Sequence, residues 1–139
     1  MSNSILLLDD DHDILSIFKT ILEEEGYKVY TGNNAEQAKA IVTEQEVNLV
    51  IMDYYPKNTN GVKIAEALKR IDENLQIIFL TGYISILDTV EDVGFKVDRV
   101  LIKPVSVIDL LREIRNVFDI DAGYRQASIP YKTIVSGRL

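Results

Sequence analysis

A chain of 139 residues is large enough for one domain with a core of its own, and 47% apolar with 27% charged residues is typical of a globular protein. The absence of cysteine and the single histidine exclude disulfides, thiolate metal sites and multi-histidine metal centres. The formal net charge of −7 argues against direct binding of nucleic acid, because contacts with phosphates need clustered Lys and Arg.

The sequence gives no sign of a membrane segment or a signal peptide. The apolar run at residues 5–8 is short and is followed at once by acidic residues. The longest stretch without charge, residues 74–87, is interrupted by Gly82 and is too short to cross a bilayer. We therefore expect a cytoplasmic protein that has no membrane partner.

Along the chain, short apolar runs that are typical of strands alternate with stretches whose apolar residues recur at helical spacing. The expected strands cover residues 4–8, 28–31, 47–53, 75–80 and 99–102. The apolar stripes of the expected helices begin at Ile14, Ala35, Val62, Ile84 and Val107, and the stripe at Ile84 is the weakest. This alternation predicts one parallel sheet that is covered by helices on both faces.

Four of the expected strands end in polar residues. These residues are Asp9 and Asp10, Asp53, Thr81, and Lys103. The carboxyl ends of parallel strands meet at one edge of a sheet, and ligands of open α/β sheets bind at that edge. We therefore expect these side chains to form one site.

The residue types at this edge suggest a particular chemistry. Three carboxylates about 4 Å apart repel each other by about 4 kcal/mol per pair at an effective dielectric near 20, so they take up protons or bind a cation. Magnesium prefers oxygen ligands of this kind. Lys103 and Thr81 suit phosphoryl oxygens, so the set predicts a site for a phosphoryl group that is attached to, or attacked by, Asp53.

The ordered set of motifs resembles the receiver domains of response regulators in two-component signalling. The motifs are the acidic opening at residues 5–11, the strand at 49–53 with Gly61 eight residues after Asp53, Thr81-Gly82, and Lys103-Pro104. The resemblance covers residues 4 to about 119. It implies a flavodoxin-like, doubly wound α/β fold with five helices and five parallel strands in the order 2-1-3-4-5.

The resemblance also implies a role for each site residue. Asp53 would accept a phosphoryl group from a sensor histidine kinase or a phosphotransfer protein, while Thr81 and Lys103 would hold the phosphoryl oxygens. The ligands of Mg²⁺ (or Mn²⁺) would be Asp9, Asp10, Asp53 and the backbone carbonyl of Tyr55. The domain would switch the binding of an unidentified output protein, with homodimerisation left open, and would not be an enzyme that acts on a metabolite.

The sequence departs from the family pattern at two places. Pro56 and Lys57 stand where most relatives have Met-Pro, so the backbone restriction that proline imposes falls on Tyr55. Val100 stands where a Phe or Tyr often acts as a rotating switch, so we expect a modified switch with Tyr83 or Tyr54 as substitutes. We also expect the rings of Tyr55 and Tyr83 to screen the phosphoryl group from water.

Two other functions are left open at this point. The altered loop and Val100 would suit a pseudo-receiver, which is an interaction scaffold that is never phosphorylated. A phosphatase of the haloacid-dehalogenase type would need a second acid where Tyr55 stands, so this function is disfavoured.

Some residues near the site have simpler interpretations. We expect Asp11 to favour a helix N-terminus and His12 to be solvated in the first helical turn. The receiver domain is expected at residues 1–119. The tail at 120–139 is expected to pack on this domain or on a neighbouring chain.

Overall fold

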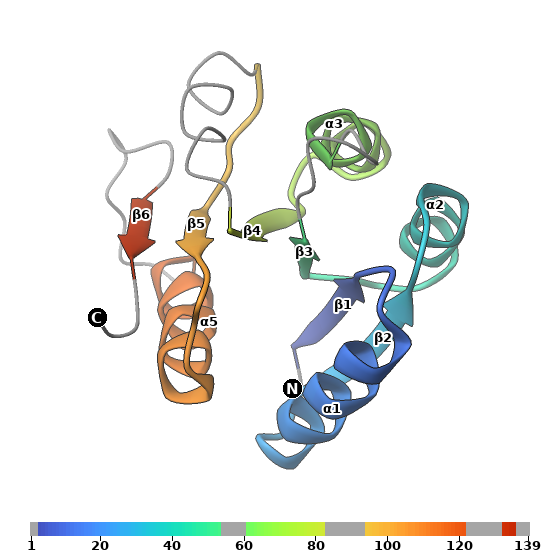
Figure 1. Cartoon of the computed structure of the whole chain (residues 1–139). Coiled ribbons are helices and arrows are strands. Elements are labelled where there is room, and N and C mark those ends of the chain that lie inside the picture. Colours follow the sequence, from blue (N-terminus) through green and yellow to red (C-terminus); the bar gives the residue numbers. More distant parts are fainter. Residues whose placement is uncertain (1–2, 54–60, 83–93, 122–131, 136–139) are drawn as a thin grey trace.

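The computed structural model describes residues 3–53, 61–82, 94–121 and 132–135. Its elements are β1 (Ser4–Leu8), α1 (His12–Glu24), β2 (Lys28–Gly32), α2 (Ala35–Glu44), β3 (Leu49–Asp53), α3 (Gly61–Ile71), β4 (Gln76–Thr81), β5 (Arg99–Ile102), α5 (Val107–Asp121) and β6 (Lys132–Val135). Strands and helices alternate in this order (Figure 1). The helix expected at Ile84, together with Tyr54, Tyr55 and Tyr83, lies outside the described residues.

The strands form one parallel sheet in the order β2-β1-β3-β4-β5-β6. The predicted order 2-1-3-4-5 is confirmed, and a sixth strand extends the sheet beside β5. In this added pair Arg99 lies opposite Lys132. Helix α5 continues to Asp121, across the domain boundary that was expected at residue 119. The last part of the chain therefore contributes a strand to the sheet of the domain.

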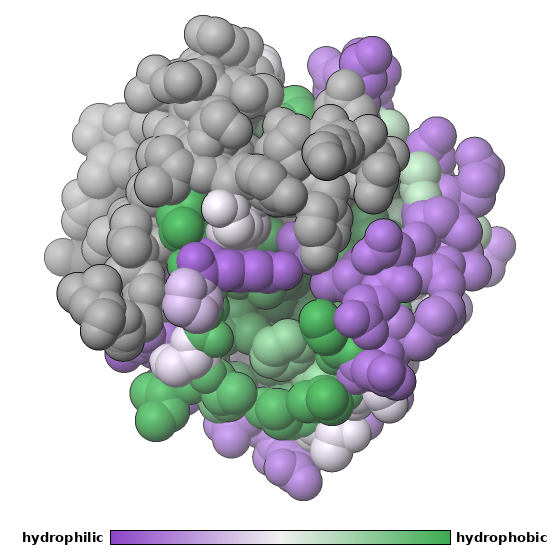
Figure 2. Space-filling view, viewed as in Figure 1, coloured by the Kyte–Doolittle hydropathy of each residue, from purple (hydrophilic) through white to green (hydrophobic). Residues whose placement is uncertain are grey.

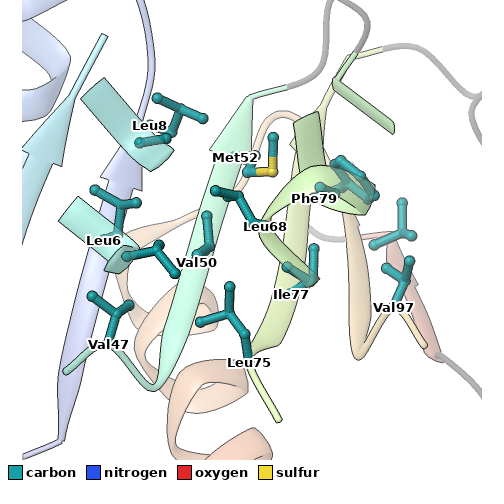
Figure 3. Close-up of a cluster of buried hydrophobic side chains, with 14 of the residues drawn as sticks. Leu6, Leu8, Val47, Val50, Met52, Leu68, Leu75, Ile77, Phe79 and Val97 are labelled. Atoms are coloured by element: carbon teal, nitrogen blue, oxygen red, sulfur yellow. The ribbon is translucent and has the colours of Figure 1, made fainter. Parts of the chain in front are cut away.

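Helices cover both faces of the sheet, with α1 and α5 on one face and α2 and α3 on the other (Figure 1). In β3, Val50 and Met52 belong to the cluster on the α2–α3 face, whereas Leu49 and Ile51 belong to the cluster on the α1–α5 face. Figure 3 shows the first cluster, with Leu6, Leu8, Val50, Met52, Leu68, Ile77 and Phe79 among its labelled members. Burial on both faces explains why these strands are nearly continuous apolar runs.

Side-chain caps mark where the first two helices begin. The Asp11 carboxylate accepts hydrogen bonds from the backbone N–H groups of Asp13 and Ile14, so it caps α1 as expected. Asn34 caps α2 in the same manner. Because α1 begins directly after this cap, Asp9 and Asp10 lie in the short turn between β1 and α1. No helix in the described part of the chain has the length and apolar character needed to cross a membrane.

Candidate functional site

Three of the predicted strand-end residues meet in one pocket. Asp9 follows β1, Asp53 ends β3 and Lys103 follows β5, and all three line this pocket. Strand β4 lies between β3 and β5, so the long lysine side chain reaches across it. Lys103 Nζ donates a hydrogen bond of 3.0 Å to Asp53 Oδ2. The sheet order thus places an ammonium group against the carboxylate that ends β3.

The Asp53 carboxylate is buried but only half satisfied. Its side chain is 3% exposed, against 32% for that of Lys103. Asp53 Oδ1 is also buried, and among the atoms of the described residues it has no hydrogen-bond partner. A buried charged oxygen without a partner is costly, and such atoms in native proteins usually have a ligand, ion or water beside them. This oxygen is therefore poised to take a cation or a covalent partner.

Asp9 adds a second carboxylate to the pocket and is half-buried. Its Oδ1 accepts a hydrogen bond of 2.9 Å from the backbone N–H of Asp11. Burial raises the pKa of Asp9 to about 6, and the negative charge of Asp53 adds to this increase, whereas Lys103 opposes it. A cation bound here would favour the charged form of Asp9. The two carboxylates therefore form an environment that favours a divalent ion.

The remaining predicted residues are placed differently. Thr81 is fully buried at the end of β4, and its backbone carbonyl accepts a hydrogen bond of 2.7 Å from the N–H of Lys103, which ties the ends of β4 and β5 together. Its side chain is not among those that line the pocket. Asp10 is exposed beside Asp9. His12, at the start of α1, is exposed as expected, and its Nε2 lies 3.0 Å from Nδ2 of Asn33.

The described residues fit magnesium through a small ligand set. Within these residues, no group of three His, Cys, Asp or Glu side chains is arranged around a common metal position. Asp9 and Asp53 nevertheless offer oxygen ligands, and magnesium typically uses one or two carboxylates, with waters and phosphate oxygens completing its shell. The unpartnered Asp53 Oδ1 is the atom that such an ion would satisfy. The backbone carbonyl of Tyr55, the other predicted ligand, lies outside the described residues.

The position of the expected switch residue is filled by the core. Val100 is completely buried in the cluster on the α2–α3 face and lies opposite Phe79 of β4. Directly after β5, the peptide bond between Lys103 and Pro104 is cis. An aliphatic core residue therefore occupies the position at which the sequence predicts a modified switch.

The pocket also has apolar walls that the sequence pattern did not reveal as part of a site. These walls include Ile14, Leu15 and Phe18 of α1, and Val105 and Leu110 near and in α5. In the sequence they belong to the same helical stripes as the core, and periodicity cannot separate a core residue from a pocket wall. The only local signal is the position of Val105, directly after Lys103-Pro104.

Comparisons with known proteins agree with this geometry. The family described as the response regulator receiver domain matches residues 5–115. The chain is 34% identical over 83 residues to sporulation initiation phosphotransferase F of Bacillus subtilis, which covers 60% of this chain and 67% of the relative. It is 32% identical over 115 residues to the transcriptional regulatory protein CpxR of Escherichia coli, which covers 83% of this chain and 49% of CpxR. The chain therefore spans about half the length of the latter regulator.

Solved structures show the same fold. A CheY-like response regulator receiver domain protein from Methanospirillum hungatei matches with a TM-score of 0.79 and 30% identity, over 88% of this chain and 98% of that chain. The response regulator protein TrrA from Thermotoga maritima, in complex with Mg²⁺-BeF, matches with a TM-score of 0.72 and 25% identity, over 83% of this chain and 98% of that one. Since fold, strand-end residues and family match agree, the chain belongs to the family of response regulator receiver domains.

Proposed function

We propose that Asp53 accepts a phosphoryl group from the phosphohistidine of a sensor histidine kinase or a phosphotransfer protein, and that this controls binding of an output protein. The observation that supports the proposal most is the half-satisfied carboxylate of Asp53. Lys103 holds one oxygen at 3.0 Å, and the other oxygen is buried without a partner among the described residues. In a purely structural ion pair, both buried carboxylate oxygens would be expected to have partners.

In the proposed step, an oxygen of Asp53 forms a bond to phosphorus while the bond from phosphorus to the imidazole nitrogen breaks. The electron pair of that bond stays with the donor histidine, and Asp53 becomes an acyl phosphate. Lys103 orients the carboxylate beforehand and places positive charge where the phosphoryl oxygens arrive. Thr81 ends β4, which lies between β3 and β5, and its hydroxyl is the expected donor to another phosphoryl oxygen.

Asp9 and Asp53, with Asp10 and the carbonyl of Tyr55, are the residues that would hold Mg²⁺ or Mn²⁺. When bound, the ion supplies positive charge that offsets the charge of the phosphoryl oxygens. The complex of TrrA with Mg²⁺-BeF supports a magnesium-dependent site in this family. The raised pKa of Asp9 supports it as well, because the charged carboxylate of Asp9 is disfavoured in this pocket and a bound cation would stabilise it.

The proposed outcome is a switch and not turnover of a metabolite. Phosphorylation adds negative charge beside Lys103 and Thr81, and it favours whichever arrangement of the neighbouring elements accommodates that charge better. Hydrolysis of the acyl phosphate then restores Asp53. With a net charge of −7, the chain suits a partner protein that presents a basic surface.

Incubation with Mg²⁺ and acetyl phosphate, followed by intact mass spectrometry, tests this function. We expect a mass gain of one phosphoryl group, which Asp53→Asn and chelation of the metal both abolish. Asp119→Asn is the matched control, because this acid is exposed on α5 and away from the pocket, so the variant keeps the gain. A folded wild-type protein that gains no phosphoryl group from any donor would instead support the scaffold without phosphorylation.

A further inference from the structure

The pocket at the strand ends continues as an apolar cavity between α1 and α5, with a volume of about 510 Å³. Figure 2 shows this face of the molecule, where hydrophobic residues floor a hollow beside a strongly hydrophilic rim. The apolar lining residues include Leu7, Leu8, Ile51 and Leu80 of the sheet, Ile14, Leu15 and Phe18 of α1, and Val105 and Leu110. Asp9, Asp53 and Lys103 bring the charged groups to this cavity.

The size of the cavity suits a whole small molecule. An apolar cavity of about 150 Å³ accommodates benzene, and pockets that bind drug-sized ligands measure roughly 300–1,000 Å³. Water gains few hydrogen bonds from walls of this kind, so an apolar group that displaces it is favoured. Walls that are mostly apolar, with a few polar groups gathered in one place, are typical of ligand sites.

The charged groups determine which ligand suits this cavity. Two carboxylates and one ammonium line it, and that ammonium already donates to Asp53 Oδ2. Asp53 Oδ1 is a buried acceptor that lacks a donor among the described residues. We propose that the cavity binds a small amphiphilic cation, with an alkyl or aryl body against α1 and α5 and an ammonium or amidinium head at Asp9 and Asp53.

A cation bound in this way would compete with a divalent ion. Its head would take the same carboxylate oxygens that the metal needs, so each ligand lowers the affinity of the other by the same factor. It would also shield Asp53 from a phosphoryl donor. This inhibition rests on the function proposed above, whereas the binding itself does not.

Three probes that share one apolar body separate the contributions of body and head. They are 4-phenylbutylammonium, 4-phenyl-1-butanol and 4-phenylbutyrate, each titrated into the wild-type protein without divalent metal and followed by calorimetry and by amide chemical shifts. We expect the cation to bind at least about tenfold more tightly than the alcohol, because a charged donor then meets a buried carboxylate. The carboxylate probe should bind most weakly. Addition of Mg²⁺ should weaken the cation and leave the alcohol largely unaffected.

Two valine variants locate the site. Val105→Phe places a larger side chain in the cavity and should weaken all three probes by about tenfold or more, the equivalent of 1.4 kcal/mol. Val107→Phe is the matched control, because Val107 is 40% exposed at the start of α5 and does not line the cavity, so binding should be unchanged. If Val105→Phe fails to fold, competition by Mg²⁺ in the wild-type protein still tests the location of the head.

Saturable binding with the order cation, alcohol, carboxylate and with competition by Mg²⁺ supports the inference. Absence of saturable binding of the cation, equal affinity for the three probes, or tighter binding of the carboxylate overturns it. Phosphorylation by acetyl phosphate is measured separately without any probe. A protein that binds the cation but gains no phosphoryl group contradicts only the proposed function, and one that is phosphorylated but binds no probe contradicts only this inference.

Discussion

The opposite ends of the parallel strands each carry an ion pair with a buried carboxylate, and the two pairs differ in how completely the carboxylate is bound. At the carboxyl ends of the strands, Lys103 binds Asp53 at 3.0 Å and leaves Asp53 Oδ1 without a partner among the described residues. At the opposite ends, Arg99 of β5 binds Glu113 of α5, also at 3.0 Å. Arg99 Nη1 additionally donates a hydrogen bond of 2.7 Å to the carbonyl of Asp98. The two ion pairs therefore have the same N–O distance but differ in how many hydrogen-bond partners their buried groups have.

The difference in partners suggests that the Arg99–Glu113 pair holds the fold, whereas the Lys103–Asp53 pair can take a ligand. The carboxylates of both pairs are buried, with exposed fractions of 7% for Glu113 and 3% for Asp53, so they differ in their partners. Glu113 Oε1 binds Arg99, and its Oε2 lies 3.9 Å from Arg112 Nε. A hydrogen bond from Gln76 Nε2 to the carbonyl of Val117 adds a second link between the sheet and α5. Lys103 is 32% exposed, and Asp53 Oδ1 has no hydrogen-bond partner among the residues that the structure describes. The proposed phosphoryl acceptor is thus the carboxylate that is incompletely paired among the described residues.

The largest expected effect lies at the Arg99–Glu113 pair. Glu113→Gln leaves the Arg99 guanidinium buried without its counter-charge, and removal of one partner of a buried pair costs about 3–5 kcal/mol in the free energy of unfolding. Equilibrium unfolding in denaturant at neutral pH measures this loss. The double variant Arg99→Met, Glu113→Leu should recover most of it, because an apolar pair of similar volume removes both charges.

The matched control for this prediction is an ion pair on the surface. Glu66 lies 3.4 Å from Arg70 one turn along α3, and both side chains are largely exposed. Glu66→Gln should change the free energy of unfolding by no more than about 0.5 kcal/mol. Equal effects of Glu113→Gln and Glu66→Gln would show that the Arg99–Glu113 pair does not hold the fold.

A smaller effect is expected from Asp9 at the carboxyl ends of the strands, and it depends on pH. The folded-state pKa of about 6 lies above the ordinary value of 3.8, so the native state binds more protons between these values. The free energy of unfolding therefore falls as pH rises from about 4 to about 6. Because Asp9 is half exposed, the loss stays well below the roughly 3 kcal/mol that such a shift gives a fully buried group.

Asp9→Asn isolates this contribution. The variant should be more stable than the wild-type protein at neutral pH, and the difference should vanish near pH 4, where the wild-type carboxyl is protonated as well. Burial also raises the pKa of Asp98, and this background is common to both proteins and cancels in the difference. A difference in unfolding free energy that stays constant with pH would contradict a raised pKa of Asp9.

The residues at the carboxyl ends of the strands were predictable from the sequence because their positions follow local rules. An apolar run that ends in Asp53 or Lys103 places that residue at the end of a strand, and β-α alternation directs parallel strands to one edge. The pair of Arg99 and Glu113 follows no local rule, because it depends on how α5 lies over β5. The pairing of β6 with β5 likewise depends on which sheet edge is open. The apolar cavity depends on side-chain volumes between two helices, which periodicity does not record.

The smallest effect separates Asp11 from its acidic neighbours. Its carboxylate accepts hydrogen bonds of 3.0 Å and 3.2 Å from the N–H groups of Asp13 and Ile14, which is a structural task at the start of α1. Asp11→Ala should therefore lower the free energy of unfolding by about 1 kcal/mol, and Asp11→Asn, which can still cap the helix, should restore most of it. Both variants should keep the phosphoryl mass gain from acetyl phosphate. Loss of the mass gain in Asp11→Asn, despite a stable fold, would place Asp11 in the phosphoryl site. Retention of the mass gain in both variants would show that one charge of this acidic run serves only the fold.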